Sequence, residues 1–441
     1  MKRFFRSILV IVVLVIVTLS FDKFYKSDNF KLKYIDKKID NNIMFKGLNG
    51  AVDFTVDNEK NYYIAYKNKI QVINKNGKSY NLILNKNLDI SSIELYGKTL
   101  YYISGCRLYC YDIASKKEKC LINNIPNFGD YKNSKIKRKD NYLYITIGSS
   151  TNSGIVGKDN EWIKEKPYNF DISPKTIILK GMNFGAQKSG AFVSYGTPNI
   201  KGQIIPGHFP GNASIIIYNL KSGAYETYSW GIRNVQGLDF NSEKKLFAIV
   251  GGMENRGLRS IKGDVDYIYE IKKDIWYGWP DYSGGDPITS PRFKDKNDKK
   301  IQFILDKHPC TNPPAPVYQH KEVSSLEHLA IDKKGVLGSK DCMYFYSNLD
   351  NKLYSLDKKG ILKQKVIFNK NCNIVGIKFF GDNIFSLDAS NGFLYQFKAK
   401  STNEFKGDFN KIIMYYMLII LVVLITIILV FQNHSKKETI K

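Results

Sequence analysis

The middle of the chain lacks any long segment with the 3.6-residue periodicity of an amphipathic helix. Between about residues 45 and 400, short apolar runs of β-strand character alternate with turns rich in Gly, Asn, Asp and Lys. This pattern argues against a helical domain and predicts an all-β fold. The region also lacks a linker-like shift in composition, which disfavours a pair of β domains or a sandwich.

Histidine and cysteine are both scarce in this chain of 441 residues. The five histidines are His208, His308, His320, His328 and His434. None has an evident partner carboxylate, so we expect each to be structural or solvated rather than catalytic. The six cysteines are Cys106, Cys110, Cys120, Cys310, Cys342 and Cys372. Their spacings match no zinc or haem motif, and disulfide pairing stays open if this region lies outside the cytoplasm.

Acidic residues are outnumbered, with 41 Asp and Glu against 66 Lys and Arg, which gives a net charge of +25. The lysines are scattered through turns, as at 37–38, 116–117 and 358–359, rather than gathered in one arm or helix face. This distribution argues against nucleic acid as a partner. It is typical of a solvated surface, or of one that attracts anionic cell-envelope polymers, phospholipid head groups or acidic glycans.

Charged residues are almost absent from two apolar segments near the ends of the chain. Residues 4–21 follow Lys2 and Arg3 and contain only Arg6 near their start, as in a signal sequence, but no convincing small-x-small cleavage site follows. They are therefore an uncleaved signal anchor or a cleaved signal. Residues 412–431 have the length of a transmembrane helix, and lysines follow them.

The charges that flank these segments predict the orientation of the chain. Positive residues at both outer ends favour two cytoplasmic termini. The region between them is then held at the cell membrane on the extracytoplasmic face by two membrane anchors.

The region 45–400 repeats one unit, in which an aromatic-rich strand, a polar turn and a second strand follow each other. Such units occupy 62–73, 100–111, 343–356 and 383–397, and two of them turn through Asp350-Asn351 and Asn391-Gly392. Repetition of this kind is typical of the blades of a β-propeller. Two long loops, 149–206 and 281–316, interrupt the repeat, and we expect them to roof the central channel.

A cluster of polar side chains precedes the apolar run that ends at residue 240. Arg233, Asn234 and Gln236 lie within four positions, and a guanidinium with two amides can grip a planar, carboxylate-bearing ligand by bidentate hydrogen bonds. Downstream, residues 263–271 lead into the sequence Tyr-Gly-Trp-Pro at 277–280. Together these segments resemble the soluble glucose/sorbosone dehydrogenase family, whose members are six-bladed β-propellers that use pyrroloquinoline quinone (PQQ).

The resemblance implies roles for particular residues. Arg233, Asn234 and Gln236 would contact a PQQ-like cofactor, unless the first two only satisfy backbone carbonyls at a blade edge. The stretch 249–253 corresponds to the turn whose carbonyls hold calcium in the family, which makes Gly252 and Met253 the candidate metal-binding residues.

Three departures from the family pattern weaken the expectation of quinone chemistry. No histidine lies in residues 129–135, where the family has its general base, and Asp130 is a weaker base. The calcium turn keeps little of its family sequence. Asp350 lies where the family has an arginine near the quinone carboxylates, and an anion there is unfavourable.

The sequence therefore predicts an all-β, six-bladed propeller over 45–400, flanked by an N-terminal signal anchor at 4–21 and a C-terminal transmembrane helix at 412–431. Its expected function is to bind a ligand or partner, such as a sugar or an anionic envelope polymer, after loss of the catalytic histidine. The alternative is an active PQQ- and calcium-dependent sugar or alcohol dehydrogenase. A structural or assembly role at the envelope overlaps the first function.

Overall fold

The computed structural model describes residues 32–36 and 38–400, which form six sheets of four or five strands around an axis. We call these sheets blades 1 to 6. Blade 1 contains β3 (Ala51–Val56), β4 (Tyr62–Tyr66), β5 (Lys69–Ile73) and β6 (Ser79–Leu84). Blade 2 contains β7 (Ile90–Tyr96), β8 (Thr99–Ser104), β9 (Arg107–Asp112) and β10 (Lys117–Ile122). Blade 3 contains β11 (Ile136–Lys139), β12 (Tyr142–Ile147), β15 (Ser214–Asn219) and β16 (Tyr225–Trp230).

The other three blades follow in chain order. Blade 4 contains β17 (Val235–Phe240), β18 (Leu246–Val250), β19 (Tyr267–Ile271) and β23 (Tyr318–Gln319). Blade 5 contains β24 (Leu326–Asp332), β25 (Cys342–Ser347), β26 (Lys352–Leu356), β27 (Leu362–Ile367) and β1 (Lys33–Tyr34). Blade 6 contains β28 (Ile374–Phe380), β29 (Asn383–Asp388), β30 (Phe393–Ala399) and β2 (Ile39–Phe45). The all-β prediction is confirmed for the described part of the chain.

The inner strands close a ring. Contacts run from β3 to β7, β11, β17, β24 and β28, and then from β28 back to β3. The outer strand of blade 6 is β2, which precedes all the other strands of that blade in the chain and pairs antiparallel with β30. Strand pairing between the two ends of the region therefore closes the propeller. Both β1 and β2 begin before residue 45, the predicted start of the region.

Aromatic and β-branched side chains explain why these segments form packed strands. In β4, for example, all five residues are buried. Six hydrophobic clusters occupy the six interfaces between adjacent blades. The expected turns at Asn351 and Gly392 are present, and both residues have positive φ, as tight turns between adjacent strands require.

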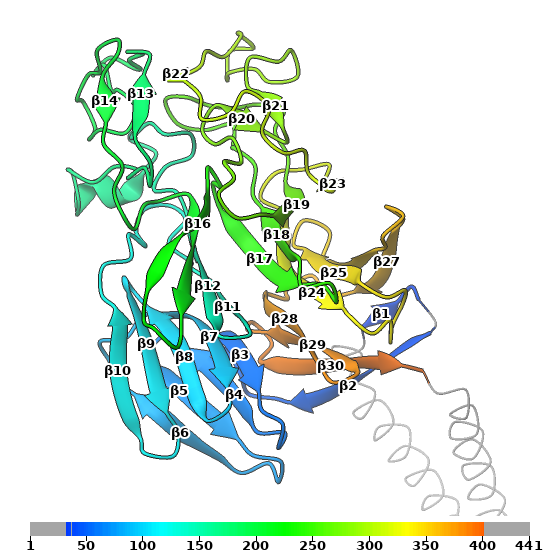
Figure 1. Cartoon of the computed structure of the whole chain (residues 1–441). Helices are drawn as coiled ribbons and strands as arrows, with labels where there is room; N and C mark the ends of the chain where they lie inside the picture. The colour runs from blue at the N-terminus through cyan, green and yellow to red at the C-terminus, as the bar shows by residue number, and fades with distance from the viewer. Residues whose placement is uncertain (1–31, 37, 401–441) are drawn as a thin grey trace, which may run out of the picture.

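The two long loops pair with each other and form a cap at one end of the propeller (Figure 1). The cap contains β13 (Ile177–Leu179), β14 (Ile204–Ile205), β20 (Tyr282–Ser283), β21 (Asp286–Pro287), β22 (Leu305–Lys307) and the 3-10 turn η2 (Glu161–Lys164). A seventh hydrophobic cluster lies inside it and includes Phe192, Trp279 and Phe293. The cap is thus an ordered structure with its own core.

Both predicted membrane segments, 4–21 and 412–431, lie outside the described residues. Within residues 32–36 and 38–400, the structure contains no helix with the length and apolar character that a membrane crossing requires.

Buried aspartates tie neighbouring blades together. The carboxylate of Asp239, on β17, accepts hydrogen bonds from the backbone of Phe240 and of Ile331 on β24, and pairs with Lys137 of β11 at 3.0 Å. Lys333 lies 3.6 Å from the same carboxylate. One side chain thus links blades 3, 4 and 5. Burial alone raises the pKa of Asp239, but Lys137 and Lys333 outweigh burial and lower it.

Replacing this carboxylate tests how strongly it joins the blades. We expect Asp239→Ala to lower the free energy of unfolding by about 3–5 kcal/mol, because it leaves the Lys137 ammonium partly buried and without its partner. The matched control is Asp382→Ala, which removes an exposed pair with Lys334 and should cost less than about 1 kcal/mol. Urea unfolding at pH 7 measures both changes, and equal effects of the two substitutions would refute the linking role.

Candidate functional site

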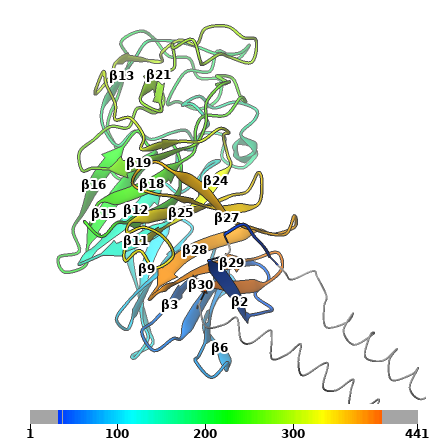
Figure 2. The same cartoon turned by 90° about the vertical axis from the view of Figure 1, so that its right-hand side faces the viewer.

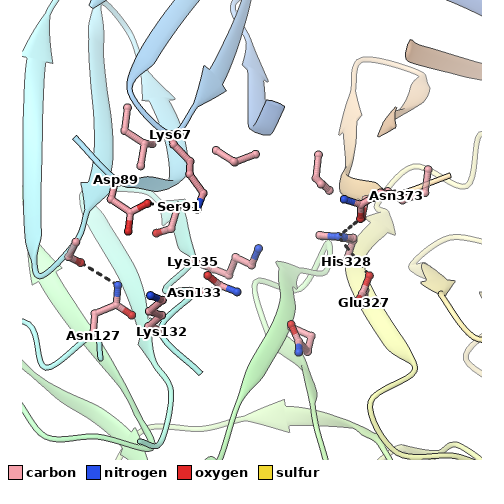
Figure 3. Close-up of a pocket in the computed structure, with 16 residues that line it drawn as sticks. Lys67, Asp89, Ser91, Asn127, Lys132, Asn133, Lys135, Glu327, His328 and Asn373 are labelled. Atoms are coloured by element: carbon pink, nitrogen blue, oxygen red, sulfur yellow. Dashed lines mark hydrogen bonds and ion pairs between the residues drawn. The ribbon is translucent and has the colours of Figure 1, made fainter. Parts of the chain in front are cut away.

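An extra residue near the start of the inner strand directs one side chain per blade toward the axis. The pairing of inner and second strands skips one residue in each of five blades. These β-bulge residues are Val52, Ser91, Gln236, His328 and Val375. A bulge re-aims the side chain that it inserts. All five line one cavity of about 270 Å³ at the centre of the ring (Figure 3).

Blade 3 contributes Lys135 without a bulge. This residue directly precedes β11, and its backbone N–H donates to Thr146 Oγ1 at 2.9 Å, while its carbonyl accepts from the Thr146 N–H at 3.0 Å. Lys135 lines the same cavity, so each of the six blades places one residue there. We call these six residues the axial ring.

The rest of the cavity wall is mostly polar. Besides the axial ring, it contains Lys67, Asp89, Lys132, Glu327, the amides Asn127, Asn133 and Asn373, and Ile90, Gly105 and Ile374. All of these residues come from outside the two cap-forming loops, 149–206 and 281–316. The expectation that the loops shape the central channel is therefore wrong for this cavity. The loops pack against each other instead, because their apolar side chains form a separate core.

His328 is held neutral in the axial ring. Its Nε2 lies 2.8 Å from the carbonyl oxygen of Ile374, which can only accept a hydrogen bond, so Nε2 carries the proton. Burial, followed by the charge of Lys135, lowers the pKa of His328 to about 3. A group with this pKa is a poor general base near neutral pH. His328 is suited to hydrogen bonding rather than to proton abstraction.

Arg233, the leading candidate from the sequence, does not line the central cavity. It is 3% exposed, and its guanidinium forms hydrogen bonds and an ion pair with other residues of the chain. Its Nε donates to the Asn152 carbonyl at 3.0 Å, and Nη2 donates to the Asn152 side chain at 2.9 Å. Nη2 also pairs with Glu254 at 3.0 Å, and the guanidinium stacks on the ring of Tyr131. The charge that was expected to hold a carboxylate ligand is already balanced by a carboxylate of the chain.

Asp130, the candidate replacement for the missing histidine base, is similarly occupied. Its carboxylate pairs with Arg256 at 2.6 Å and accepts hydrogen bonds at 2.8 Å from Asn160 and from the indole N–H of Trp162. Arg256 also pairs with Glu254 at 2.5 Å. These contacts leave the Asp130 carboxylate fewer lone pairs for a substrate proton.

Asn234 is buried beside Arg233, and its carbonyl accepts a hydrogen bond from the Gly251 N–H at 2.9 Å. It does not line the central cavity. Gln236 does line it, as the bulge residue of β17. Of the three predicted cofactor contacts, only Gln236 therefore reaches the central cavity.

The predicted calcium turn faces two aspartates through its N–H groups. The Gly252 N–H donates to Asp266 at 3.1 Å, and the Met253 N–H donates to Asp264 at 2.6 Å. Three or more metal-ligating side chains do not cluster anywhere in the described residues. These hydrogen bonds use the N–H groups of the turn and not its carbonyls, so the assignment of Gly252 and Met253 as calcium-binding residues stays a prediction.

The other described histidines have structural partners. His308 lies in the cap, 3.0 Å from the buried carboxylate of Asp281, and stacks on Trp276. His320 lies 3.0 Å from the Tyr318 hydroxyl, and the Nδ1 of His208 lies 3.0 Å from a backbone carbonyl. The sequence left His308 without a carboxylate partner because Asp281 is 27 positions away.

Sequence reasoning missed Lys135, Glu327 and His328 as cavity residues. Strict alternation along a strand cannot identify His328, which a bulge turns to the axis. The usable signal is position, since the bulge residue is the second or third residue of the first strand in five of the six blades.

No protein-family model and no curated protein matches the chain. Among solved structures, the carbohydrate-active enzyme of family AA12 from Trichoderma reesei, in a calcium structure, aligns with a TM-score of 0.57 at 12% identity, over 85% of this chain and all of that one. The holo form of the PQQ domain of a pyranose dehydrogenase from Coprinopsis cinerea aligns with a TM-score of 0.56 at 12% identity, over 83% of this chain and 97% of that one. The resemblance to PQQ-dependent sugar dehydrogenases is confirmed as a likeness of fold.

The ion pair of Glu254 leads to a pH-dependent prediction. Burial alone raises the pKa of Glu254, but Arg233 and Arg256 outweigh burial and lower it to about 2. Because this pKa lies below the unfolded value, the stabilisation is complete above about pH 4.5 and is lost as the pH falls toward 2. We expect Glu254→Gln to lower the free energy of unfolding by about 3 kcal/mol at pH 7 and by progressively less below pH 4.5.

Urea unfolding at pH 7, 5, 4 and 3 measures this difference. The control is Glu161→Gln, which changes an exposed carboxylate in the cap and should have little effect at any of these pH values. A deficit for Glu254→Gln that stays constant or grows on acidification would contradict the assignment.

Proposed function

We propose that the chain is a binding protein that takes up a small polar molecule in the central cavity and does not use a quinone cofactor. The observation that carries this proposal is the internal ion pair between Arg233 and Glu254, 3.0 Å long and buried on the arginine side. This ion pair occupies the Arg233 guanidinium, which would hold a quinone carboxylate. The contacts of Asp130 occupy the carboxylate that would replace the missing base.

PQQ bears three carboxylates and needs cations with free donors, and the residues around Arg233 do not fit it. Binding a carboxylate there would displace Glu254 from a largely buried pair, and separating such a pair costs about 3–5 kcal/mol. The hollow beside Arg233 measures only about 20 Å³. We therefore assign no step of any reaction to this cofactor.

The central cavity is a more suitable ligand-binding site than the hollow beside Arg233. Its volume of about 270 Å³ is close to the lower limit of roughly 300 Å³ for small-molecule sites. Its wall combines charged groups and amides with the apolar side chains of Val52 and Val375. A few placed polar groups among apolar ones are typical of sites that fix the orientation of a small ligand. The fold likeness to sugar dehydrogenases is compatible with a sugar as ligand, but a shared fold does not specify a function.

We also propose that two apolar segments, 4–21 and 412–431, hold the propeller on the outer face of a membrane. The clustered positive charges at both outer ends support this orientation. In that position, the net charge of +25 favours contact with anionic envelope polymers. The membrane would then keep the binding site at the cell surface.

The absence of quinone use is tested by titrating PQQ and calcium into the purified full-length chain in detergent. We expect no stoichiometric change in cofactor absorbance and no sugar-dependent dye reduction, because Glu254 and Asp130 occupy the required groups. Glu254→Gln should not restore turnover. Tight stoichiometric binding of PQQ with sugar-dependent turnover would refute the proposal.

The proposed orientation is tested through the exposed cysteines Cys106, Cys120 and Cys310. After treatment of intact cells with an impermeant reductant, an impermeant maleimide should label the full-length chain in the membrane fraction. A variant with serine at these three positions is the control for labelling of other sites. Labelling only after the cells are permeabilised, or recovery of the chain in the soluble fraction, would contradict the orientation.

A further inference from the structure

The central cavity has walls of opposite charge. Lys67, Lys132 and Lys135 lie on one side with Asp89, and Glu327 lies on the other side with His328 and Asn373 (Figure 3). The first group comes from blades 1 and 2 and the segment that enters blade 3, and the second group comes from blades 5 and 6. The propeller ring keeps the two groups apart across the open space.

On the cationic side, neither Lys132 nor Lys135 forms an ion pair with a carboxylate in the part of the chain that the structure describes. Lys67 already has Asp89 at 4.0 Å near the exposed rim. The nearby carboxylate of Asp53 pairs with Lys378 at 2.7 Å and accepts hydrogen bonds from Ser92 and the backbone of blade 2. Burial lowers the pKa of Lys135, opposed by the charges of Asp53 and Glu327. Its ammonium is therefore incompletely compensated and would gain from an anionic partner.

On the other side, Glu327 is only partly satisfied. One of its oxygens accepts a hydrogen bond from the Asn348 amide at 2.9 Å. The other lies 3.9 Å from His328 Nε2, whose proton is donated to the Ile374 carbonyl. Burial raises the pKa of Glu327, in spite of the Asn348 hydrogen bond and the charge of Lys135. This carboxylate would gain from a cationic partner.

We infer that the cavity binds a small zwitterion, with its anionic group against Lys135 and Lys132 and its cationic group against Glu327. This inference rests on the proposed function, because it names the class of ligand for the same cavity. A simple anion would be repelled by Glu327, and a simple cation would be repelled by the lysines. A neutral sugar would exclude water from both charged walls without supplying a counter-charge.

The volume of the cavity limits the size of the zwitterion. About 270 Å³ is small for a drug-sized ligand, so an amino acid, a dipeptide or an amino-sugar acid is the appropriate scale. Gln236, from the axial ring, adds a hydrogen-bonding amide to the cavity wall, and Ser91 adds a hydroxyl on the lysine side that donates to the Ser134 carbonyl at 3.0 Å.

The test is isothermal titration calorimetry of the full-length chain in detergent with probes of matched size. The zwitterions are glycine, 4-aminobutyrate and 6-aminohexanoate, which vary the distance between the charges. Butyrate, butylamine and glucose supply the anion, the cation and the neutral sugar. We expect at least one zwitterion to bind tenfold or more tightly than butyrate, butylamine and glucose.

Two substitutions test which side chain binds each charged group of the zwitterion. Lys135→Met and Glu327→Gln keep side-chain size and should each weaken binding of the preferred zwitterion at least tenfold, whereas Lys135→Arg should retain it. Lys201→Met and Glu161→Gln remove exposed charges in the cap and should leave binding unchanged. Thermal unfolding of each variant confirms that the propeller is intact.

Other outcomes separate the inference from the proposed function. If glucose binds better than every zwitterion and Gln236→Ala abolishes that binding, the zwitterion inference is wrong and the cavity is still the binding site. Butyrate that binds as tightly as 4-aminobutyrate, and more tightly to Glu327→Gln, also overturns the inference in favour of an anion site. If none of the probes binds and PQQ does, both the inference and the proposed function fail.

Discussion

One residue near the start of each inner strand, an extra residue in five of the six blades, determines which side chains this propeller turns toward its axis. A regular strand would alternate its side chains between the two neighbouring blades, and the axis would receive none. The bulge adds a position that belongs to neither interface, so its side chain can be polar without disturbing the packing between blades. Gln236 and His328 occupy such positions next to the apolar Val52 and Val375, and Lys135 reaches the cavity without a bulge. The axial ring is thus chemically independent of the six hydrophobic clusters that stabilise the ring of blades.

The second constraint is charge balance around Arg233. A buried guanidinium must be compensated, and in this chain Glu254, Asn152 and Tyr131 compensate it from within. Structures with this architecture at 12% identity include a PQQ domain, and a likeness at this identity shows a shared fold only.

The fold could be predicted from the sequence because the patterns that define its blades lie within short stretches of the chain. Repeated aromatic strands and turns such as Asn391-Gly392 define the blades without reference to distant residues. The pairing of β2 with β30 joins the two ends of the region, and no local pattern reveals it. The contacts of the candidate site residues could not be predicted for the same reason. Arg233 is ion-paired with Glu254, 21 positions away, and hydrogen-bonded to Asn152, 81 positions away, and residue type alone cannot show that these partners meet.

The most direct test of this account is a crystal structure of the full-length chain, purified with whatever small molecule it carries from its own cells. The account predicts electron density for a small polar molecule between Lys135 and Glu327, with the Arg233–Glu254 ion pair intact. A planar, polycarboxylate cofactor contacted by Arg233, with Glu254 displaced and a metal ion at Gly252 and Met253, would contradict it.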